Sequence, residues 1–270
     1  MFHGGGELRT ENQEPRTRNR EPRTMRVCLL PLKIEPRNPS VNLQHFQQRL
    51  AEVARYAPDL ICLPECAFTG YLYEPHDLEQ YATPIPGETT AIVAALARTY
   101  CCAICFGMLE CATEGWYSSA VLVEPSGHLA LVQRKMSEQS PFNVGDDIHI
   151  VDTAAGRLAI LICGDLFDER ARTMLGSRAD IVVVPLARSF DGTSPDTERW
   201  LREERQAYAD AVRTLQVTAL IVNALEDPTQ PEASFGGAMV VSPTGDILAE
   251  SPHGTEDALI FDVYGSSQIR

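Results

Sequence analysis

The stretch LAILICGDLFDER, residues 158–170, decides how the chain is interpreted. Five apolar residues lead into Cys163, and Gly164 and Asp165 follow it at once. A buried strand that ends at a thiol and then turns is typical of α/β proteins, which keep their chemistry at strand ends. Because glycine has no Cβ, we expect Gly164 to provide the turn, expose the sulfur and present its backbone N–H to a bound molecule.

Strand-like and helix-like segments alternate outward from this stretch. Apolar residues at helical spacing predict helices over 41–56, 88–100, 169–178 and 196–215. Apolar runs predict strands over 26–32, 59–65, 102–110, 179–187, 218–225 and 258–264. Turn residues at 125–127, 156 and 243–245 predict three hairpins. Since hairpins interrupt the alternation, we expect an α/β fold with two mixed sheets and the helices outside.

The composition narrows the class of protein. With 270 residues and 44% hydrophobic residues, the chain can bury a substantial core, yet no apolar run approaches the ~20 residues of a membrane helix. A net charge of −14 argues against a nucleic-acid partner, because phosphate binding needs a basic surface. We therefore expect neither membrane nor nucleic acid as a partner.

Eight cysteines lie mostly inside apolar runs, which favours buried thiols in a reducing, cytoplasmic compartment over a disulfide framework. Cys102 and Cys105 have C-x-x-C spacing, but no second pair follows at zinc-finger spacing. The six histidines form no H-x-x-x-H pattern either, so the sequence predicts no metal site.

Residues 1–24 have almost no apolar content and contain a near-repeat, NQEPRTR followed by NREPRTM, that extends into Met25. Such a segment cannot bury enough surface to offset its ordering entropy, so we expect a disordered tail. Residues 25–270 contain no linker and are predicted to form a single domain. The tail is expected to be dispensable, with Met25 as a possible translation start; deleting residues 1–24 should leave stability and activity intact.

Three reactive side chains each follow a buried strand. Glu65 follows DLICLP, Lys135 follows LALVQR and Cys163 follows LAILI. Each alone would be read as a core or surface group, but strand ends meet in space and can form one pocket. A carboxylate can take the proton of a thiol, and an ammonium can stabilise the thiolate and a later oxyanion. The set therefore predicts nucleophilic catalysis by Cys163.

At these residues the chain resembles the nitrilase superfamily of carbon–nitrogen hydrolases. The resemblance covers about residues 25–263 and rests on DLICLPECAFTGY (59–71), GHLALVQRK (127–135), RLAILICGD (157–165) and FGGAMVVSPTGDILAES (235–251). It implies an α-β-β-α sandwich that forms a homodimer or a higher homo-oligomer and works without a cofactor. It also implies that Glu65, Lys135 and Cys163 are catalytic.

The family has a second glutamate that steadies the lysine and helps to position substrate. Glu138 is the candidate in this sequence, in a short segment after Lys135, and Glu110 is the weaker one. Together with the backbone N–H of Gly164, we expect Glu138 to serve oxyanion and substrate binding.

The resemblance implies hydrolysis of a small linear amide through a thioester on Cys163. Nitrile-cleaving members usually carry Trp-Glu where this chain has Gly164 and Asp165, which favours an amide over a nitrile. A carbamoyl (ureido) substrate, a glutaminase-like activity and acyl transfer to an amine stay open. The alternative from another class is a family member that binds or assembles without catalysis, since a fold alone does not fix function.

Overall fold

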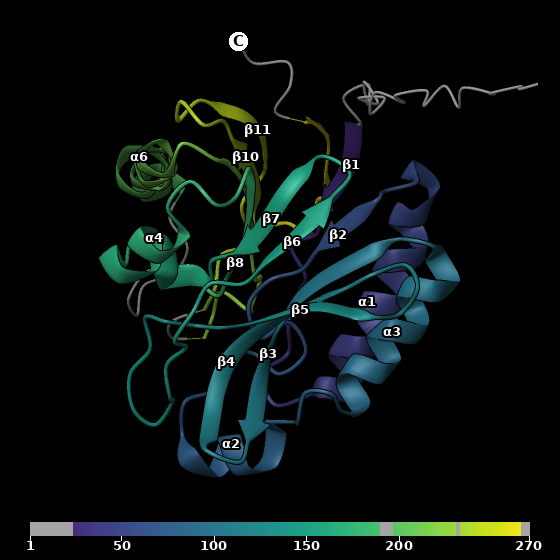
Figure 1. Ribbon diagram of the computed structural model, residues 1–270. Coiled ribbons are helices and arrows are strands. Elements are labelled where there is room, and N and C mark those ends of the chain that lie inside the picture. Colours follow the sequence, from purple (N-terminus) through teal and green to yellow (C-terminus); the bar gives the residue numbers. More distant parts are fainter. Residues whose placement is uncertain (1–23, 190–196, 231–232, 266–270) are drawn as a thin grey trace, which may run out of the picture.

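The computed structural model describes residues 24–189, 197–230 and 233–265. Among these residues, two six-stranded mixed sheets form the centre of the molecule (Figure 1). The first sheet has the order β12-β1-β2-β3-β4-β5. Its strands are β1 (Thr24–Leu29), β2 (Leu60–Cys62), β3 (Ala103–Ala112), β4 (Gly115–Val123), β5 (Leu129–Arg134) and β12 (Leu259–Tyr264).

The second sheet repeats this plan, with the order β11-β10-β9-β8-β7-β6. Its strands are β6 (Ile150–Thr153), β7 (Gly156–Ile160), β8 (Ile181–Leu186), β9 (Thr218–Asn223), β10 (Ala238–Val241) and β11 (Ile247–Ser251). In each sheet three parallel strands, β1–β2–β3 and β7–β8–β9, lie in the middle, and antiparallel neighbours flank them. The carboxyl ends of the parallel strands thus meet at one edge of each sheet.

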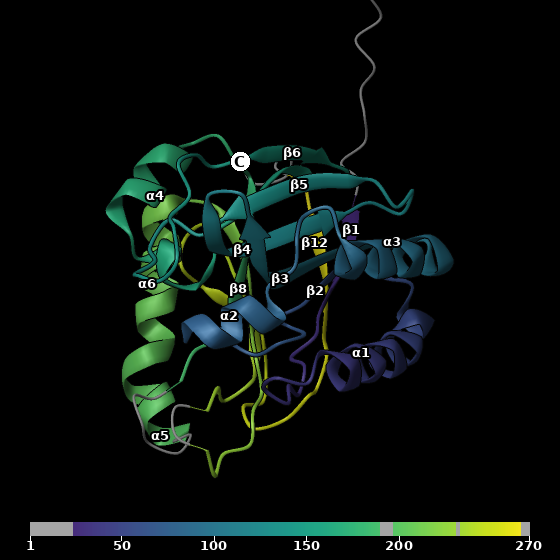
Figure 2. The same cartoon turned by 90° about the horizontal axis from the view of Figure 1, so that it is seen from below.

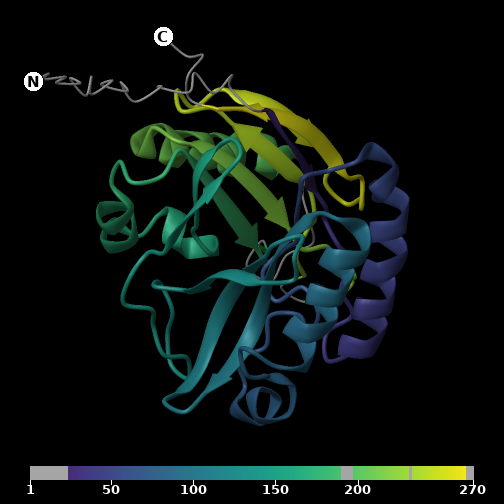
Figure 3. The same ribbon diagram turned by 45° about the vertical axis from the view of Figure 1, so that its right-hand side comes forward.

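Helices cover the outer face of each sheet, and Figure 2 shows the two helical layers on opposite sides of the strands. The first layer contains α1 (Pro39–Val53) and α3 (Glu88–Tyr100), which stand side by side in Figure 3. The second layer contains α4 (Glu169–Leu175) and α6 (Arg205–Leu215). The expected α-β-β-α sandwich is therefore confirmed.

Three apolar clusters fill the spaces between these layers. One lies between the sheets, where Leu60 and Val27 meet Leu158 and Val183. A second packs α1 and α3 on the first sheet, and a third packs α4 and α6 on the second. Because the parallel strands are covered on both faces, they read as continuous apolar runs in the sequence.

The predicted hairpins at 125–127, 156 and 243–245 are confirmed as the β4–β5, β6–β7 and β10–β11 connections. The predicted helix over 196–215 is found as α5 (Thr197–Arg199), a π-helical turn at Trp200–Glu204, and α6. The sequence missed α2 (Pro75–Tyr81) and the short 3₁₀ turns at Ala54–Tyr56 and Cys163–Leu166. The predicted disordered tail lies outside the described residues, except that Thr24 already pairs with Tyr264 in β1.

All eight cysteines are free thiols, as the sequence predicts. Five are buried, whereas Cys101 and Cys111 are exposed and Cys163 is half-buried. No helix in the described part of the chain is long and apolar enough to cross a membrane.

Candidate active site

Glu65 lies where the two sheets come together. The chain leaves β2 through Leu63 and Pro64, and the Glu65 backbone N–H then donates to Leu186 O of the second sheet at 3.3 Å. Gly107 on β3 lies directly behind it, with its N–H donating to Pro64 O at 3.0 Å. A Cβ on Gly107 would lie 2.5 Å from the Glu65 Cα, so only glycine allows this approach. The Glu65 side chain is buried.

Lys135 follows β5 directly and donates through Nζ to Glu65 Oε1 at 2.9 Å. The Ser118 hydroxyl on β4 donates to the same oxygen at 2.9 Å. Burial alone would lower the pKa of Lys135, but the charges of Glu65 and Glu138 outweigh burial and raise that pKa above its ordinary value. Lys135 is thus a fixed cation inside the protein.

Cys163 follows β7 after two further extended residues and has φ +49°. Gly164, which we expected to provide the turn, is not in the left-handed region; the turn lies at Cys163 itself. The glycine is needed for space, because a Cβ there would lie 2.8 Å from Ser137 Oγ. A non-glycine residue in this conformation costs of order 1–3 kcal/mol, which the surrounding contacts must offset.

The Cys163 thiol meets the groups contributed by the first sheet. It interacts electrostatically with both Glu65 and Lys135. Burial, followed by the charge of Glu65, raises the pKa of Cys163 to about 12, although Lys135 opposes this shift. At neutral pH the sulfur therefore keeps its proton at rest, and Glu65 is positioned to accept that proton. The structure thus brings the three predicted residues together in one place.

The two candidate second glutamates lie in different surroundings. Glu138 forms an ion pair with Lys135 and accepts hydrogen bonds from the Tyr71 hydroxyl at 2.7 and 2.9 Å. Glu110 instead pairs with Arg134 and accepts from Ser119 Oγ at 2.6 Å. Lys135 is therefore contacted by two carboxylates, Glu65 and Glu138, whereas Glu110 lies outside this cluster.

Sequence reasoning missed two residues that hold the site. The Tyr71 ring packs against the ammonium of Lys135, with its centroid 5.0 Å from Lys135 Nζ. Asp165 joins the two loops: it accepts from Ser137 N, Ser137 Oγ and Met136 N at 2.8–2.9 Å, and from Ile162 N at 3.1 Å. Both residues stand inside quoted motifs, but only the folded contacts reveal what they do.

A cavity of about 370 Å³ opens beside the thiol. Cys163 and Gly164 line it on one side, and Phe167, Arg188 and Tyr208 line it on others. This volume lies in the range of small-molecule pockets. Within the described residues, no group of three or more His, Cys, Asp or Glu side chains is arranged to hold a metal ion.

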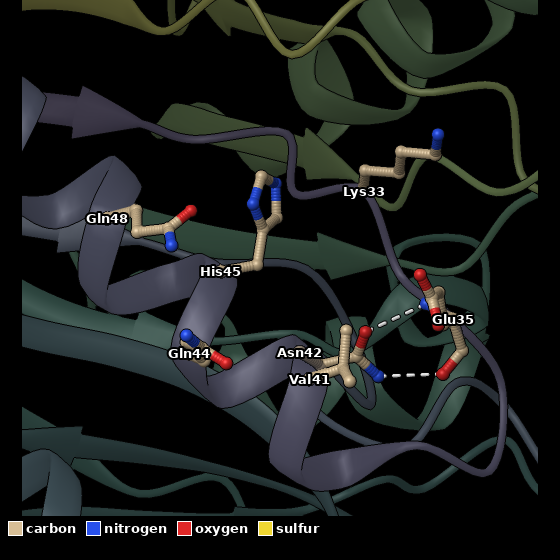
Figure 4. Close-up of a pocket in the computed structure, with 7 residues that line it drawn as sticks. All are labelled: Lys33, Glu35, Val41, Asn42, Gln44, His45 and Gln48. Atoms are coloured by element: carbon tan, nitrogen blue, oxygen red, sulfur yellow. Dashed lines mark hydrogen bonds between the residues drawn. The ribbon is translucent and has the colours of Figure 1, made fainter.

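A second hollow, of about 260 Å³, lies beside α1 and is shown in Figure 4. Its buried polar group, Asn42, is fully engaged: it accepts from Glu35 N and donates to Glu35 O and Phe68 O, each at 2.8 Å. Its lining contains no cysteine, serine or threonine. Asn42 therefore holds the chain beyond Glu65 in place, whereas the thiol of Cys163 lines the other cavity.

The chain is similar to known proteins over most of its length. The carbon–nitrogen hydrolase family model matches residues 26–267. An (R)-stereoselective amidase of Pseudomonas sp. is 28% identical over 232 residues, covering 84% of this chain and 81% of that protein. The solved carbon–nitrogen hydrolase of Helicobacter pylori G27 superimposes with a TM-score of 0.75 at 21% identity, covering 89% of each chain.

A second solved structure shows a modified active-site cysteine in another member of this fold. It is a glutamate-to-glutamine mutant of the amidase from Nesterenkonia sp. AN1, with a TM-score of 0.71 at 18% identity, covering 89% of this chain and 90% of that chain. It shows covalent addition of the acetamide moiety of fluoroacetamide at the active-site cysteine. At this identity the likeness establishes a shared fold.

Proposed function

Because the chain belongs to the carbon–nitrogen hydrolase family, we propose that it hydrolyses the C–N bond of small linear amides through a thioester on Cys163. The observation that carries this proposal is the cluster in which the Cys163 thiol is electrostatically coupled to Glu65, whose carboxylate accepts a hydrogen bond from the buried Lys135 ammonium at 2.9 Å. The amidase named among its relatives supports an amide as the substrate class.

In the first half of the reaction, Glu65 accepts the proton of Cys163 as the sulfur attacks the amide carbonyl carbon. The carbonyl electron pair moves onto oxygen, where Lys135 Nζ and the Gly164 N–H stabilise the negative charge. Glu65 then returns the proton to the amide nitrogen. The C–N bond breaks, ammonia leaves, and the acyl group stays on the sulfur as a thioester.

In the second half, a water molecule takes the place of ammonia. Glu65 accepts a proton from this water as its oxygen attacks the thioester carbonyl. When the tetrahedral intermediate collapses, the C–S bond breaks, the carboxylic acid leaves and the sulfur recovers its proton. Glu138 acts through Lys135 in both halves, by holding the ammonium on the oxyanion side of the carboxylate.

Ammonia release from a panel of substrates tests this proposal. We expect the wild-type protein to release ammonia from propionamide, and the panel adds an N-carbamoyl compound and propionitrile to identify the preferred class. Cys163→Ala should abolish turnover and Glu65→Gln should nearly do so. Cys101→Ala, at an exposed thiol far from these residues in the sequence, is the matched control and should keep full activity.

Ammonia release by Cys163→Ser close to that of the parent would contradict thiol catalysis. No ammonia from any member of the panel would favour a binding or assembly role instead.

We further propose that the enzyme works in the cytoplasm as a homo-oligomer. The eight unpaired thiols support a reducing compartment, and the family resemblance supports pairing of subunits. Light scattering of the purified protein tests the second point: a mass above 29.8 kDa is expected, and a monomer at micromolar concentration contradicts it.

A further inference from the structure

Tyr208 is a buried aromatic residue whose ring is fixed in place. It lies on α6 and is only 3% exposed. Its ring packs edge-on against Phe167, with centroids 5.0 Å apart, and against Trp200 at 5.8 Å. Trp200 is anchored in turn, because its indole N–H donates to Glu250 at 3.1 Å. The position of the Tyr208 hydroxyl is therefore set before any ligand binds.

That hydroxyl has no hydrogen-bond partner among the residues that the structure describes. This oxygen is not among the fully buried side-chain atoms that lack a partner, so it is reached from the open space beside it. Tyr208 lines the cavity that also contains Cys163 and Gly164. An unpaired donor in the wall of a reactive cavity is available to a bound molecule.

The electrostatic surroundings place the phenol oxygen near the reacting groups. Burial, followed by the charge of Cys163, raises the pKa of Tyr208 above its ordinary value, and Arg188, Glu204 and Glu65 also act on it. The phenol therefore keeps its proton throughout the neutral range and can donate it in a hydrogen bond.

The rest of the cavity shows which part of the substrate meets this donor. The carbonyl carbon must lie at the sulfur and its oxygen at Lys135 and the Gly164 N–H. The space beside Gly164 is lined by Phe167 and Tyr208, so the proposed reaction would leave the acyl chain of the substrate there. Arg188 and Glu204, paired at 2.9 Å, make the neighbouring wall polar as well.

We propose that the Tyr208 hydroxyl donates a hydrogen bond to an oxygen on the acyl chain of the substrate. The preferred substrates are then small amides with a hydroxyl or carbonyl group next to the amide, such as 2-hydroxy amides. This assignment rests on the proposed amide hydrolysis. It makes Tyr208 a specificity-determining residue, distinct from the groups that break the bond.

The test compares lactamide with isobutyramide, which has a methyl group in place of the hydroxyl. The readout is the ratio of kcat/KM for lactamide to kcat/KM for isobutyramide, in which any change common to both substrates cancels. Tyr208→Phe keeps the ring and should lower this ratio roughly 3- to 10-fold, the value of one neutral hydrogen bond. Tyr56→Phe, at a half-exposed tyrosine after α1, is the matched control and should leave the ratio unchanged.

An unchanged ratio in Tyr208→Phe, with both amides still turned over, overturns the assignment alone. If the wild-type protein turns over propionamide but neither of these amides, the assignment alone fails; if it turns over none of the three, the proposed hydrolysis fails as well.

A binding measurement covers the case of an inactive variant. In a Cys163→Ala background, lactamide should raise Tm more than isobutyramide does, and Tyr208→Phe should remove that excess. Equal shifts from the two amides before Tyr208 is changed would contradict a hydrogen bond to the acyl oxygen.

Discussion

At the scale of single residues, the site is a balance of charges around one sulfur. Glu65 and Glu138 contribute two negative charges and Lys135 one positive charge, all buried. Burial first, and then the charge of Glu65, raises the pKa of Cys163 and disfavours a resting thiolate. During attack the negative charge moves from the carboxylate to the substrate oxygen, next to Lys135. The site therefore stabilises negative charge on the substrate oxygen in the transition state more than negative charge on the sulfur of a resting thiolate.

The role of Glu138 can be separated from that of an ordinary buried ion pair. Glu138→Gln removes a negative charge from Lys135 and should lower kcat/KM roughly 10-fold or more, because the ammonium loses its position. Because the ammonium acts on the oxyanion of the transition state, this loss should fall on kcat and leave KM nearly unchanged.

Glu110→Gln is the matched control for this experiment. It removes the carboxylate that pairs with Arg134, one residue before Lys135. It should lower the free energy of unfolding by about 1–3 kcal/mol while leaving kcat unchanged. Equal losses of kcat in the two variants, or a loss in Glu138→Gln that is confined to KM, would refute the assignment.

Asp165 gives a stability prediction with a definite sign. Burial raises the pKa of Asp165 from 3.8 to about 6, although four hydrogen bonds oppose the shift. The folded protein thus holds this proton more tightly than the unfolded chain. The resulting stability is full below pH 3.8 and is lost as the pH rises through about 6.

Asp165→Asn provides the reference, because asparagine does not titrate. The free energy of unfolding of the wild type minus that of the variant should decrease by about 3 kcal/mol between pH 3.8 and pH 7. Urea unfolding at a series of pH values measures this difference. A difference that is constant or grows with pH would show that Asp165 is ionised throughout.

At the scale of secondary-structure elements, the site is assembled from the ends of strands in both sheets. Glu65 and Lys135 follow β2 and β5 of the first sheet, whereas Cys163 follows β7 of the second. The Glu65 N–H bond to Leu186 O ties the two sheets together at this point. A small shift of one sheet relative to the other would therefore separate the Glu65 carboxylate from the Cys163 thiol.

Gly107 on β3 controls this packing, and two alanine variants test its role. Gly107→Ala places a Cβ 2.5 Å from the Glu65 Cα and should cost about 1–3 kcal/mol of stability. Because Glu65 must move, kcat should fall roughly 100-fold.

Gly87→Ala is the matched control. Its Cβ would lie 2.3 Å from Pro84 O, a similar clash that involves no residue of the site. It should lower the stability, as measured by urea unfolding, and leave kcat unchanged. A comparable loss of kcat in both variants would mean that Gly107 matters only for stability.

The sequence was most informative where the signal is local. An apolar run followed by a reactive residue marks a strand end, and this places Glu65, Lys135 and Cys163 correctly on the fold. The contacts of Asp165 and Tyr208 could not be predicted, because their partners are set by packing between distant segments. The turn was predicted at Gly164 because glycine readily adopts positive φ. The structure instead has the positive φ at Cys163. The Asp165 carboxylate accepts a hydrogen bond from Ile162 N beside this turn, a contact that the sequence does not reveal.

At the scale of the whole molecule, the two sheets form a sandwich with a shared apolar interior and two outer helical layers. The periodicity of the sequence predicted this architecture, because strands buried on both faces and amphipathic helices have distinct patterns. The single domain over 25–270 and the dispensable tail stay predictions. The sandwich brings the thiol from one sheet together with the carboxylate and the ammonium from the other. We propose that this arrangement makes the thiol the nucleophile of the reaction.

Rapid acid quenching during turnover of propionamide, followed by peptide mass mapping, tests that claim most directly. We predict a propionyl group on the peptide that contains Cys163, its removal by hydroxylamine as the hydroxamate, and no acylation or ammonia release in Cys163→Ala. A propionyl group on any other residue, or steady ammonia release by Cys163→Ala, would contradict the account.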